Sequence, residues 1–231
     1  MKIAFCYSGM FRDFTKNIDN HIENLFSGHD VDIYMSFWDI QGLGNFRNPV
    51  EGVDSETITD EEKDTVIQKL NPKFVEYEHF LPMEKYFKEV EIQKEQVRDF
   101  PPYIRNIMSM YYKIQKCGVE VEKSGIEYDL VVRLRTDLWF NQKVDFTNIK
   151  KGVFYYNVFK NMSWGGDCYD DKFFYGDLQV MNSVKNIYSD LDNLWSKTNY
   201  FAAPEHLLYL GIKMNEIESK DIIINYRIVE N

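Results

Sequence analysis

The spacing of hydrophobic residues predicts strands that alternate with helices along the first third of the chain. An apolar run over residues 2–7, stopped by Ser8-Gly9, predicts a buried strand that enters a tight loop. Apolar residues then recur at spacings of three and four, as in an amphipathic helix that Gly28 is placed to end: Phe11, Phe14, Ile18, Ile22 and Leu25. A second strand is predicted over residues 31–37.

The middle of the chain predicts three further helices and one strand. Thr59 and Glu62 have the spacing of a capping box, and Asn71-Pro72 would stop the helix that it begins. A third strand is predicted over residues 73–77, and a charged, solvated helix over 83–97. The longest helix is expected to begin near Pro102 and to end near Ser124-Gly125.

The rest of the chain continues the alternation. We predict a strand over residues 131–140, another over 153–158, a loop over 161–171, a helix over 178–195, a helix that begins at Pro204, and a final strand over 222–229. This order predicts an α/β fold with a mostly parallel, mixed sheet and helices on both faces. We expect one domain over residues 1–231, since no linker, repeat or low-complexity segment is present.

Composition changes this picture mainly through charge. Hydrophobic residues make up 44% of the chain, which is enough to bury a core. The formal net charge is −10, because 37 acidic residues outnumber 27 basic ones, and this surface repels nucleic acid and anionic lipid. We therefore expect no nucleic-acid partner. An anionic ligand would therefore have to bind at a local cluster of arginines.

Cysteine usage and the absence of long apolar runs indicate a cytoplasmic protein. Cys6, Cys117 and Cys168 are an odd number without CxxC spacing, which fits neither a disulfide framework nor a zinc site. The apolar start lacks a small-residue cleavage site before Arg12 and Asp13, so we interpret it as a strand and not as a signal peptide. No apolar run approaches the roughly 20 residues of a membrane span, so no transmembrane segment is expected.

The segment VVRLRTDLWF carries the strongest chemical signal. In a strand, Leu130, Val132 and Leu134 would share one face, and Arg133, Arg135 and Asp137 the other. Two guanidinium groups suit the oxygens of a diphosphate, and a nearby carboxylate suits a divalent cation that bridges it. The alternative is structural: an arginine pairs with Asp137 or Asp129 and ties down a sheet edge.

Two other strand ends offer contacts to the same ligand. Ser8-Gly9 can present backbone N–H groups and Arg12 can add charge, although the stretch lacks the later glycines of a dinucleotide-binding GxGxxG motif. The alternative is a glycine that only permits a turn. Trp38 and Asp39 can contact a nucleobase or ribose, or else they are a core tryptophan and a capping aspartate.

The loop around Trp164 is a candidate binding site for a sugar that accepts a transferred group. Gly165 and Gly166 let the backbone approach a ligand, and Trp164 can stack on a sugar ring. Four aspartates are candidates for the base that deprotonates an acceptor hydroxyl: Asp167, Asp170, Asp171 and Asp177. Each can instead be a solvated turn residue or a helix N-cap. The four histidines have no metal-ligand spacing, and GxSxG, HExxH and GxxxxGK[ST] motifs are absent.

The order of several segments resembles a family of small glycosyltransferases found in large DNA viruses and in bacterial surface-polysaccharide gene clusters. The segments are KIAFCYSGMFRDF, DIYMSFWD, SMYYKIQKC leading into YDLVVRLRTDLWF, DDKFFYGD and PEHLLY. The resemblance implies a GT-A-like fold, with residues 1–140 binding a nucleotide-diphosphate sugar donor and 141–231 binding a glycan acceptor. For a viral protein it implies the cytoplasm of the host cell.

The resemblance also assigns roles to residues. It implies that Ser8, Gly9 and Arg12 contact the nucleotide, that Arg133 and Arg135 lie near the diphosphate, that Asp137 binds Mn²⁺ or Mg²⁺, and that Asp171, or else Asp167, is the catalytic base. GT-A enzymes commonly carry Asp-x-Asp, whereas this chain has Arg135-Thr136-Asp137. A non-catalytic nucleotide-binding or sugar-binding module, and another nucleotide-using transferase such as a methyltransferase, are the alternatives.

Overall fold

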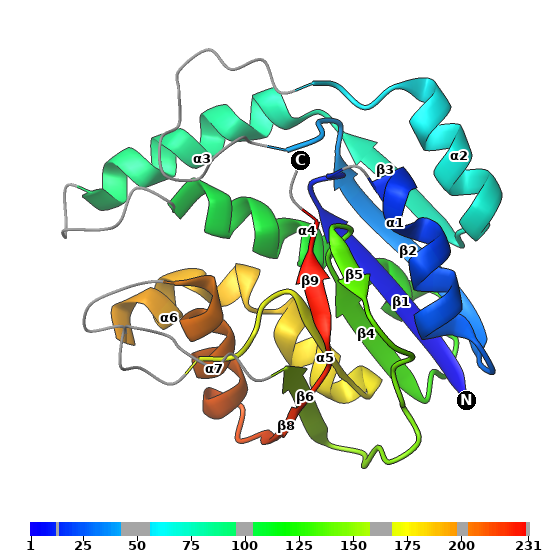
Figure 1. Ribbon diagram of the computed structural model, residues 1–231. Helices are drawn as coiled ribbons and strands as arrows, with labels where there is room; N and C mark the ends of the chain where they lie inside the picture. Colours follow the sequence, from blue (N-terminus) through cyan, green and yellow to red (C-terminus); the bar gives the residue numbers. More distant parts are fainter. Residues whose placement is uncertain (13, 43–55, 96–103, 158–167, 198–202, 230–231) are drawn as a thin grey trace.

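Four parallel strands form the first part of the main sheet in the computed structural model, which describes residues 1–12, 14–42, 56–95, 104–157, 168–197 and 203–229. The seven-stranded sheet has the order β3-β2-β1-β4-β7-β6-β8. Its first four strands are β3 (Phe74–Glu78), β2 (Asp30–Trp38), β1 (Lys2–Gly9) and β4 (Leu130–Leu134). Their carboxyl ends therefore meet at one edge of the sheet, called the carboxyl edge below (Figure 1).

The second part of the sheet makes it mixed. β7 (Phe173–Gly176) is antiparallel to both β4 and β6 (Val153–Asn157), while β8 (Glu218–Ile222) is parallel to β6. The amino end of β7 consequently lies at the carboxyl edge, beside the end of β4. A separate two-stranded sheet pairs β5 (Leu138–Phe140) with β9 (Tyr226–Ile228), and Figure 1 shows β9 running alongside β5.

One face of the sheet is covered by the first helices. α1 (Phe14–His21) continues into a π-helix, η1 (Ile22–Phe26), and α2 (Asp60–Leu70) packs beside α1. These helices bury aromatic and aliphatic side chains against the sheet together with the side chains of its strands. α2 begins with the predicted capping box, in which Thr59 Oγ accepts from the Glu62 backbone N–H and the Glu62 side chain accepts from the Thr59 backbone N–H.

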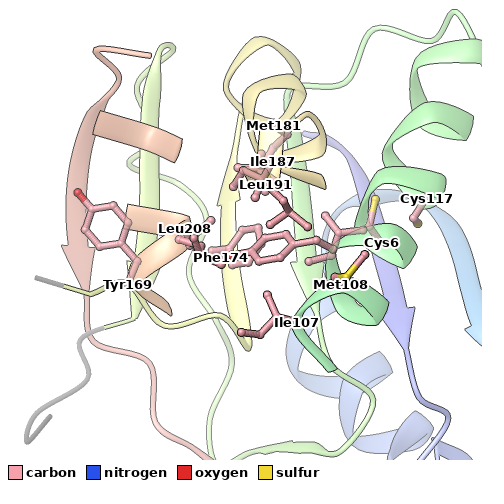
Figure 2. Close-up of a cluster of buried hydrophobic side chains, with 14 of the residues drawn as sticks. Cys6, Ile107, Met108, Cys117, Tyr169, Phe174, Met181, Ile187, Leu191 and Leu208 are labelled. Carbon is pink, nitrogen blue, oxygen red and sulfur yellow. The ribbon is translucent and has the colours of Figure 1, made fainter. Parts of the chain in front are cut away.

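The opposite face is covered by α4 (Ile104–Lys123) and by the helices of the second half. These are α5 (Leu178–Lys185), η2 (Tyr188–Asp190), α6 (Leu191–Lys197) and α7 (Pro204–Met214), while α3 (Phe80–Glu95) packs on α4. Figure 2 shows how Ile107 and Met108 of α4, Phe174 of β7 and Leu208 of α7 fill this part of the core. The expected α/β fold, with a mostly parallel mixed sheet and helices on both faces, is confirmed.

The prediction of one strand over residues 131–140 is wrong. β4 ends at Leu134, the chain turns at Thr136-Asp137, and β5 then belongs to the second sheet. The turn is stable because its polar groups have partners: the Arg135 N–H donates to Lys172 O at 3.0 Å, and Asn17 Nδ2 donates to Thr136 O at 3.0 Å. Alternation of faces holds only inside β4, where Leu130, Val132 and Leu134 join one apolar cluster and Val131 the other.

Three other boundaries differ from the prediction. The helix over residues 178–195 is divided into α5, η2 and α6, and the Asp190 N–H donates to both Asn186 O and Ile187 O where the helix tightens. The final strand over 222–229 is two strands, β8 and β9, in different sheets. β7 was missed, because its short apolar run follows three charged residues. The three cysteines are free, as expected, and none of the helices in the described ranges is long and apolar enough to cross a membrane.

Buried His21 makes the fold sensitive to pH. Its Nδ1 accepts from Tyr7 Oη at 3.2 Å and its Nε2 donates to Leu138 O at 2.6 Å, so it joins α1 to β1 and β5 as a neutral ring. Burial lowers the pKa of His21 from 6.5 to about 4. Because the unfolded state binds the proton first, stability from this group is present above pH 6.5 and is lost as the pH falls toward 4, by up to about 3 kcal/mol.

We expect urea unfolding to show this loss between pH 6.5 and 5. The His21→Asn variant should be less stable at pH 7 and should have a smaller slope of unfolding free energy against pH. His79→Asn is the control, because the His79 side chain is 87% exposed. An unchanged slope in His21→Asn would contradict the assignment.

Candidate functional site

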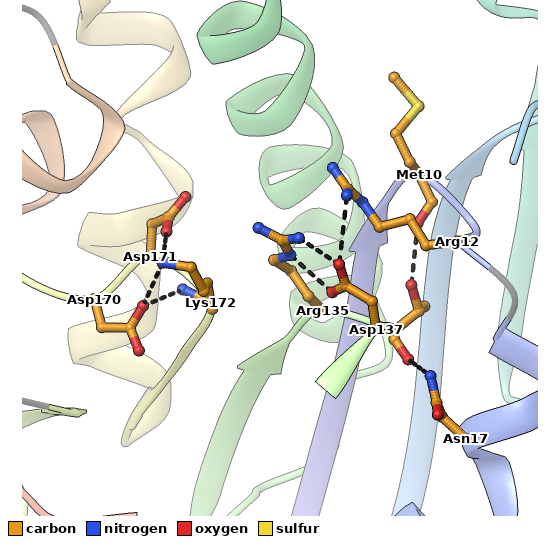
Figure 3. Close-up of polar contacts among 9 residues, drawn as sticks. Met10, Arg12, Asn17, Arg135, Asp137, Asp170, Asp171 and Lys172 are labelled. Atoms are coloured by element: carbon orange, nitrogen blue, oxygen red, sulfur yellow. Dashed lines mark hydrogen bonds and ion pairs between the residues drawn. The ribbon is translucent and has the colours of Figure 1, made fainter. Parts of the chain in front are cut away.

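Charged side chains from three parts of the chain gather at the carboxyl edge between β1 and β4. Arg12 follows β1, Arg133 is in β4, and Arg135 and Asp137 follow β4. The carboxyl edge is where open parallel sheets bind ligands. Asp170, Asp171 and Lys172, which lead into β7, lie across from Arg135 (Figure 3). The structure thus brings together residues 12, 133, 135, 137 and 171, which are all candidate site residues of the sequence analysis.

Asp137 is held by two arginines. Arg135 Nε donates to Asp137 Oδ1 at 2.9 Å and Arg135 Nη2 to Oδ2, which is a fork-like contact, while Arg12 Nη1 lies 3.3 Å from Oδ2. The Asp137 side chain is only 3% exposed, whereas those of Arg12 and Arg135 are 23% and 17% exposed. Burial works against the charge of Asp137, but Arg135 and Arg12 outweigh it and lower its pKa. The structural alternative for this segment, an ion pair, is therefore present.

The backbone on both sides of this ion pair is fixed. Gly9 has φ +114°, a conformation that glycine adopts without strain, and it lets the chain turn sharply after β1. Arg12 itself has φ +50°, and its N–H donates to Gln41 O at 2.7 Å. Thr136 Oγ1 donates to Met10 O at 3.2 Å and so ties the turn after β4 to the loop after β1. A non-glycine residue in the left-handed region is uncommon and is often found at functional sites.

Arg133 is the most deeply buried of the three arginines, at 2% exposure. Its Nε donates to Ser8 Oγ at 3.4 Å, and its guanidinium carbon lies 5.6 Å from the centre of the Phe174 ring. Its Nη1 is buried and has no hydrogen-bond partner among the described residues. A buried donor without a partner is costly, so this atom is available to an anionic ligand.

The arginines also repel one another. Burial and the charge of Arg135 lower the pKa of Arg12 to about 10, with Arg133 adding to the effect. Burial lowers the pKa of Arg133 too, against the opposing charge of Asp171. An anion placed among the three guanidinium groups would relieve this repulsion. Three guanidinium groups thus lie close together on a chain of net charge −10, with the Asp137 carboxylate between two of them.

Asp170, Asp171 and Lys172 form a buried charged group beside the arginines. Lys172 Nζ lies 3.2 Å from Asp170 Oδ1 and 3.3 Å from Asp171 Oδ1, and Tyr226 Oη donates to Asp170 Oδ2. Burial opposes the charge of Asp171, but Lys172 and Arg133 outweigh it and lower its pKa. Burial raises the pKa of Asp170, and the charge of Asp171 adds to this.

Glu205, in the first turn of α7, completes the acidic side of the site. Its backbone O accepts from the Tyr169 N–H at 3.2 Å, which joins α7 to the loop before β7. Burial, reinforced by Asp171, raises the pKa of Glu205 to about 7. Sequence reasoning missed this residue, although a glutamate directly after the proline that begins a helix was visible in PEHLLY.

Other predicted site residues lie elsewhere or outside the described ranges. Trp38 is 0% exposed and stacks on Tyr112, and Asp39 Oδ1 accepts the Phe80 N–H at 3.0 Å at the start of α3. The pair therefore has the arrangement of a core tryptophan and a capping aspartate. Asp177 is the N-cap of α5. The predicted acceptor residues Trp164, Gly165 and Gly166, and the candidate base Asp167, lie outside the residues that the structure describes.

The described residues do not fit the expected Mn²⁺ or Mg²⁺ at Asp137. Both oxygens of Asp137 already accept from guanidinium groups. Within the described ranges, no group of three or more histidine, cysteine, aspartate or glutamate side chains is arranged to hold a metal ion. A hard cation needs several oxygen ligands, and the described residues around Asp137 do not supply them.

Comparison with known proteins adds nothing to this geometry. Neither a protein-family model nor a curated protein matches the sequence.

Proposed function

We propose that the protein is a glycosyltransferase with a GT-A-like fold that acts in the cytoplasm and moves a sugar from a nucleotide-diphosphate sugar to a glycan hydroxyl. The observation that carries the proposal is the convergence of Arg12, Arg133 and Arg135 at the carboxyl edge. Three guanidinium groups there match a dianionic diphosphate better than any other common ligand group. The order of sequence motifs that resembles small glycosyltransferases selects the sugar nucleotide among diphosphate ligands.

Each arginine has a distinct role in this proposal. Buried Arg133, fixed on Ser8 Oγ, is prearranged and offers Nη1 to a phosphate oxygen. Arg12 and Arg135 are partly exposed, so their guanidinium groups can move from Asp137 to the diphosphate. As the bond to the sugar breaks, negative charge grows on the leaving diphosphate, and fixed positive charge stabilises that charge.

A melting-temperature screen of the pure protein tests the proposal. The ligands are UDP, GDP, dTDP and CMP sugars, each with manganese and with a chelator. We expect one nucleotide to raise the melting temperature by several degrees at about 100 times its dissociation constant, since the free energy gain is then about 2.7 kcal/mol. The shift should persist in the chelator, because the arginines supply the positive charge.

Adding S-adenosylmethionine to the ligands, and assaying sugar transfer to glycans, separates the alternatives. Stabilisation without sugar transfer to any glycan would favour a non-catalytic binding module. Stabilisation by S-adenosylmethionine and by none of the sugar nucleotides would favour a methyltransferase. A shift that requires manganese would return Asp137 to the role of metal ligand.

A further inference from the structure

We propose that Glu205 is the base that accepts the proton of the acceptor hydroxyl, and that the acceptor sugar binds against the first turn of α7. The inference rests on the proposed function and goes beyond it, because it names a catalytic residue and an acceptor side that the sequence resemblance does not. It replaces the assignment of Asp171 as base.

Glu205 is held at the edge of the arginine site by neighbours on two elements. Tyr111 of α4 donates its hydroxyl hydrogen to Pro204 O at 2.7 Å, and the Tyr169 N–H donates to Glu205 O at 3.2 Å. The first turn of α7 is therefore fixed against the loop that carries Asp171 and Lys172. This arrangement places the Glu205 carboxylate close enough to Asp171 for their charges to interact.

The other carboxylates of the site are already engaged. Asp170 and Asp171 are 0% and 6% exposed and share Lys172, and Asp170 also accepts from Tyr226. Glu205 is only partly buried. Apart from its own backbone N–H, its carboxylate has no hydrogen bond or ion pair in the part of the chain that the structure describes. It is thus the acid of this group best able to meet a substrate.

The groups around Glu205 give it the proton affinity that a base requires at neutral pH. Burial disfavours its charge most, Asp171 and Asp170 add to this effect and Lys172 opposes it, while the hydroxyl of Tyr111 is bonded to the neighbouring carbonyl. The helices α5 and α6 pack on α7, and this part of the core contains the apolar side chains of Leu191 and Leu194 from α6 and of Ile187, which precedes η2. The resulting pKa of about 7 lies where general bases work best.

Aromatic side chains on the same part of the fold suit a sugar. On α7, His206 and Tyr209 stack with ring centres 6.0 Å apart. Tyr209 packs edge to face on Tyr169 with ring centres 5.3 Å apart, and the ring centres of Tyr169 and Tyr156 are 4.0 Å apart. His206, Tyr209 and Tyr156 are partly buried. Aromatic faces next to a carboxylate are the surface on which sugar rings stack.

The step that we propose is a single displacement. The acceptor oxygen forms a bond to the anomeric carbon of the donor sugar while the bond from that carbon to the diphosphate oxygen breaks. The electron pair leaves with the diphosphate, toward Arg12, Arg133 and Arg135, and the acceptor proton passes to a Glu205 carboxylate oxygen. Attack from the side opposite the leaving group inverts the anomeric configuration, so the product should have the inverted configuration.

The Glu205→Gln variant tests this role. Sugar transfer should fall at least 100-fold, since general base catalysis contributes roughly 10²–10⁴-fold, while the affinity for the donor nucleotide should stay within threefold of wild type. The wild-type rate should rise as the pH passes through about 7, because the deprotonated carboxylate is the active form, and the variant should lose this rise. Glu61→Gln is the matched control, an exposed glutamate in the first turn of α2, and should behave as wild type.

Two results would overturn the inference. One is sugar transfer by a folded Glu205→Gln protein at more than a tenth of the wild-type rate. The other is a carboxyl pKa near 4 for Glu205 when ¹³C-labelled glutamate is titrated by NMR, a measurement that needs no substrate. Failure of the proposed function would look different: no sugar nucleotide would bind to wild type, and the inference would fall with it. Glu205→Asp, which keeps the acid, should recover part of the rate if the Gln variant is unstable.

Discussion

Replacing Arg133 by glutamine is expected to weaken nucleotide-diphosphate binding by tenfold to more than a hundredfold. A hydrogen bond to a charged group contributes about 1.5–3 kcal/mol, and Arg133 Nη1 is a buried donor without a partner among the described residues. The Arg133 side chain is fixed by its hydrogen bond to Ser8 and its contact with the Phe174 ring, so no neighbouring arginine can take its place. Calorimetric titration with the nucleotide that gives the largest melting shift measures the effect.

A loss of nucleotide binding in Arg133→Gln has to be distinguished from a loss of folding stability. Arg133 also offsets the charge of buried Asp171, so Arg133→Gln should lower stability as well. Arg133→Lys keeps the charge but not the planar guanidinium group, so its affinity for the nucleotide should lie between those of wild type and Arg133→Gln. Arg227→Gln is the matched control, because Arg227 is exposed on β9 and lies over Trp139. Wild-type affinity in a folded Arg133→Gln protein would remove Arg133 from the donor site.

The Asp137→Asn variant separates an ion-pair role from a metal-ligand role. Asp137 is 3% exposed and holds two arginines, so its neutralisation should lower the unfolding free energy by about 3 kcal/mol. The same change removes the carboxylate that competes with the diphosphate for Arg12 and Arg135. We therefore expect nucleotide affinity in chelator to be kept or increased, and nucleotide to restore much of the lost stability.

A metal-ligand role predicts the reverse pattern. The variant would then keep its stability and lose a manganese-dependent activity or affinity. Urea unfolding with and without nucleotide, together with titrations in manganese and in chelator, distinguishes the two accounts. Asp129→Asn provides the comparison, because Asp129 is an aspartate outside the site that accepts from the Lys2 backbone N–H at 2.8 Å.

Local patterns in the sequence were sufficient to predict most elements of the fold. The capping box of Thr59 and Glu62, the apolar periodicity of α4 and the run that forms β1 are each encoded within a few residues. The break after Leu134 is not. It depends on partners far away in sequence, namely Lys172 O for the Arg135 N–H and Asn17 for Thr136 O. The alternation of apolar and charged residues that continues past Leu134 does not reveal such a turn.

The candidate site, like the fold, is only partly predictable from local sequence patterns. That Arg12, Arg133 and Arg135 meet follows from the parallel pairing of β1 with β4. The alternation of strands and helices predicts a parallel sheet but not that these two strands are neighbours. The strand pairing does not predict which carboxylate remains able to contact a substrate. Asp171 lies 3.3 Å from the Lys172 ammonium, while the first turn of α7, which carries Glu205, is held by hydrogen bonds from Tyr111 and Tyr169, far away in sequence.

We propose that the arginines at the carboxyl edge hold the diphosphate of a nucleotide sugar. A crystal structure of the protein with its preferred nucleoside diphosphate tests it most directly. We predict phosphate oxygens within hydrogen-bond distance of Arg133 Nη1, with Arg12 or Arg135 turned from Asp137 toward the ligand. A diphosphate bound away from these arginines, with the contacts of Asp137 to Arg12 and Arg135 unchanged, would contradict the account.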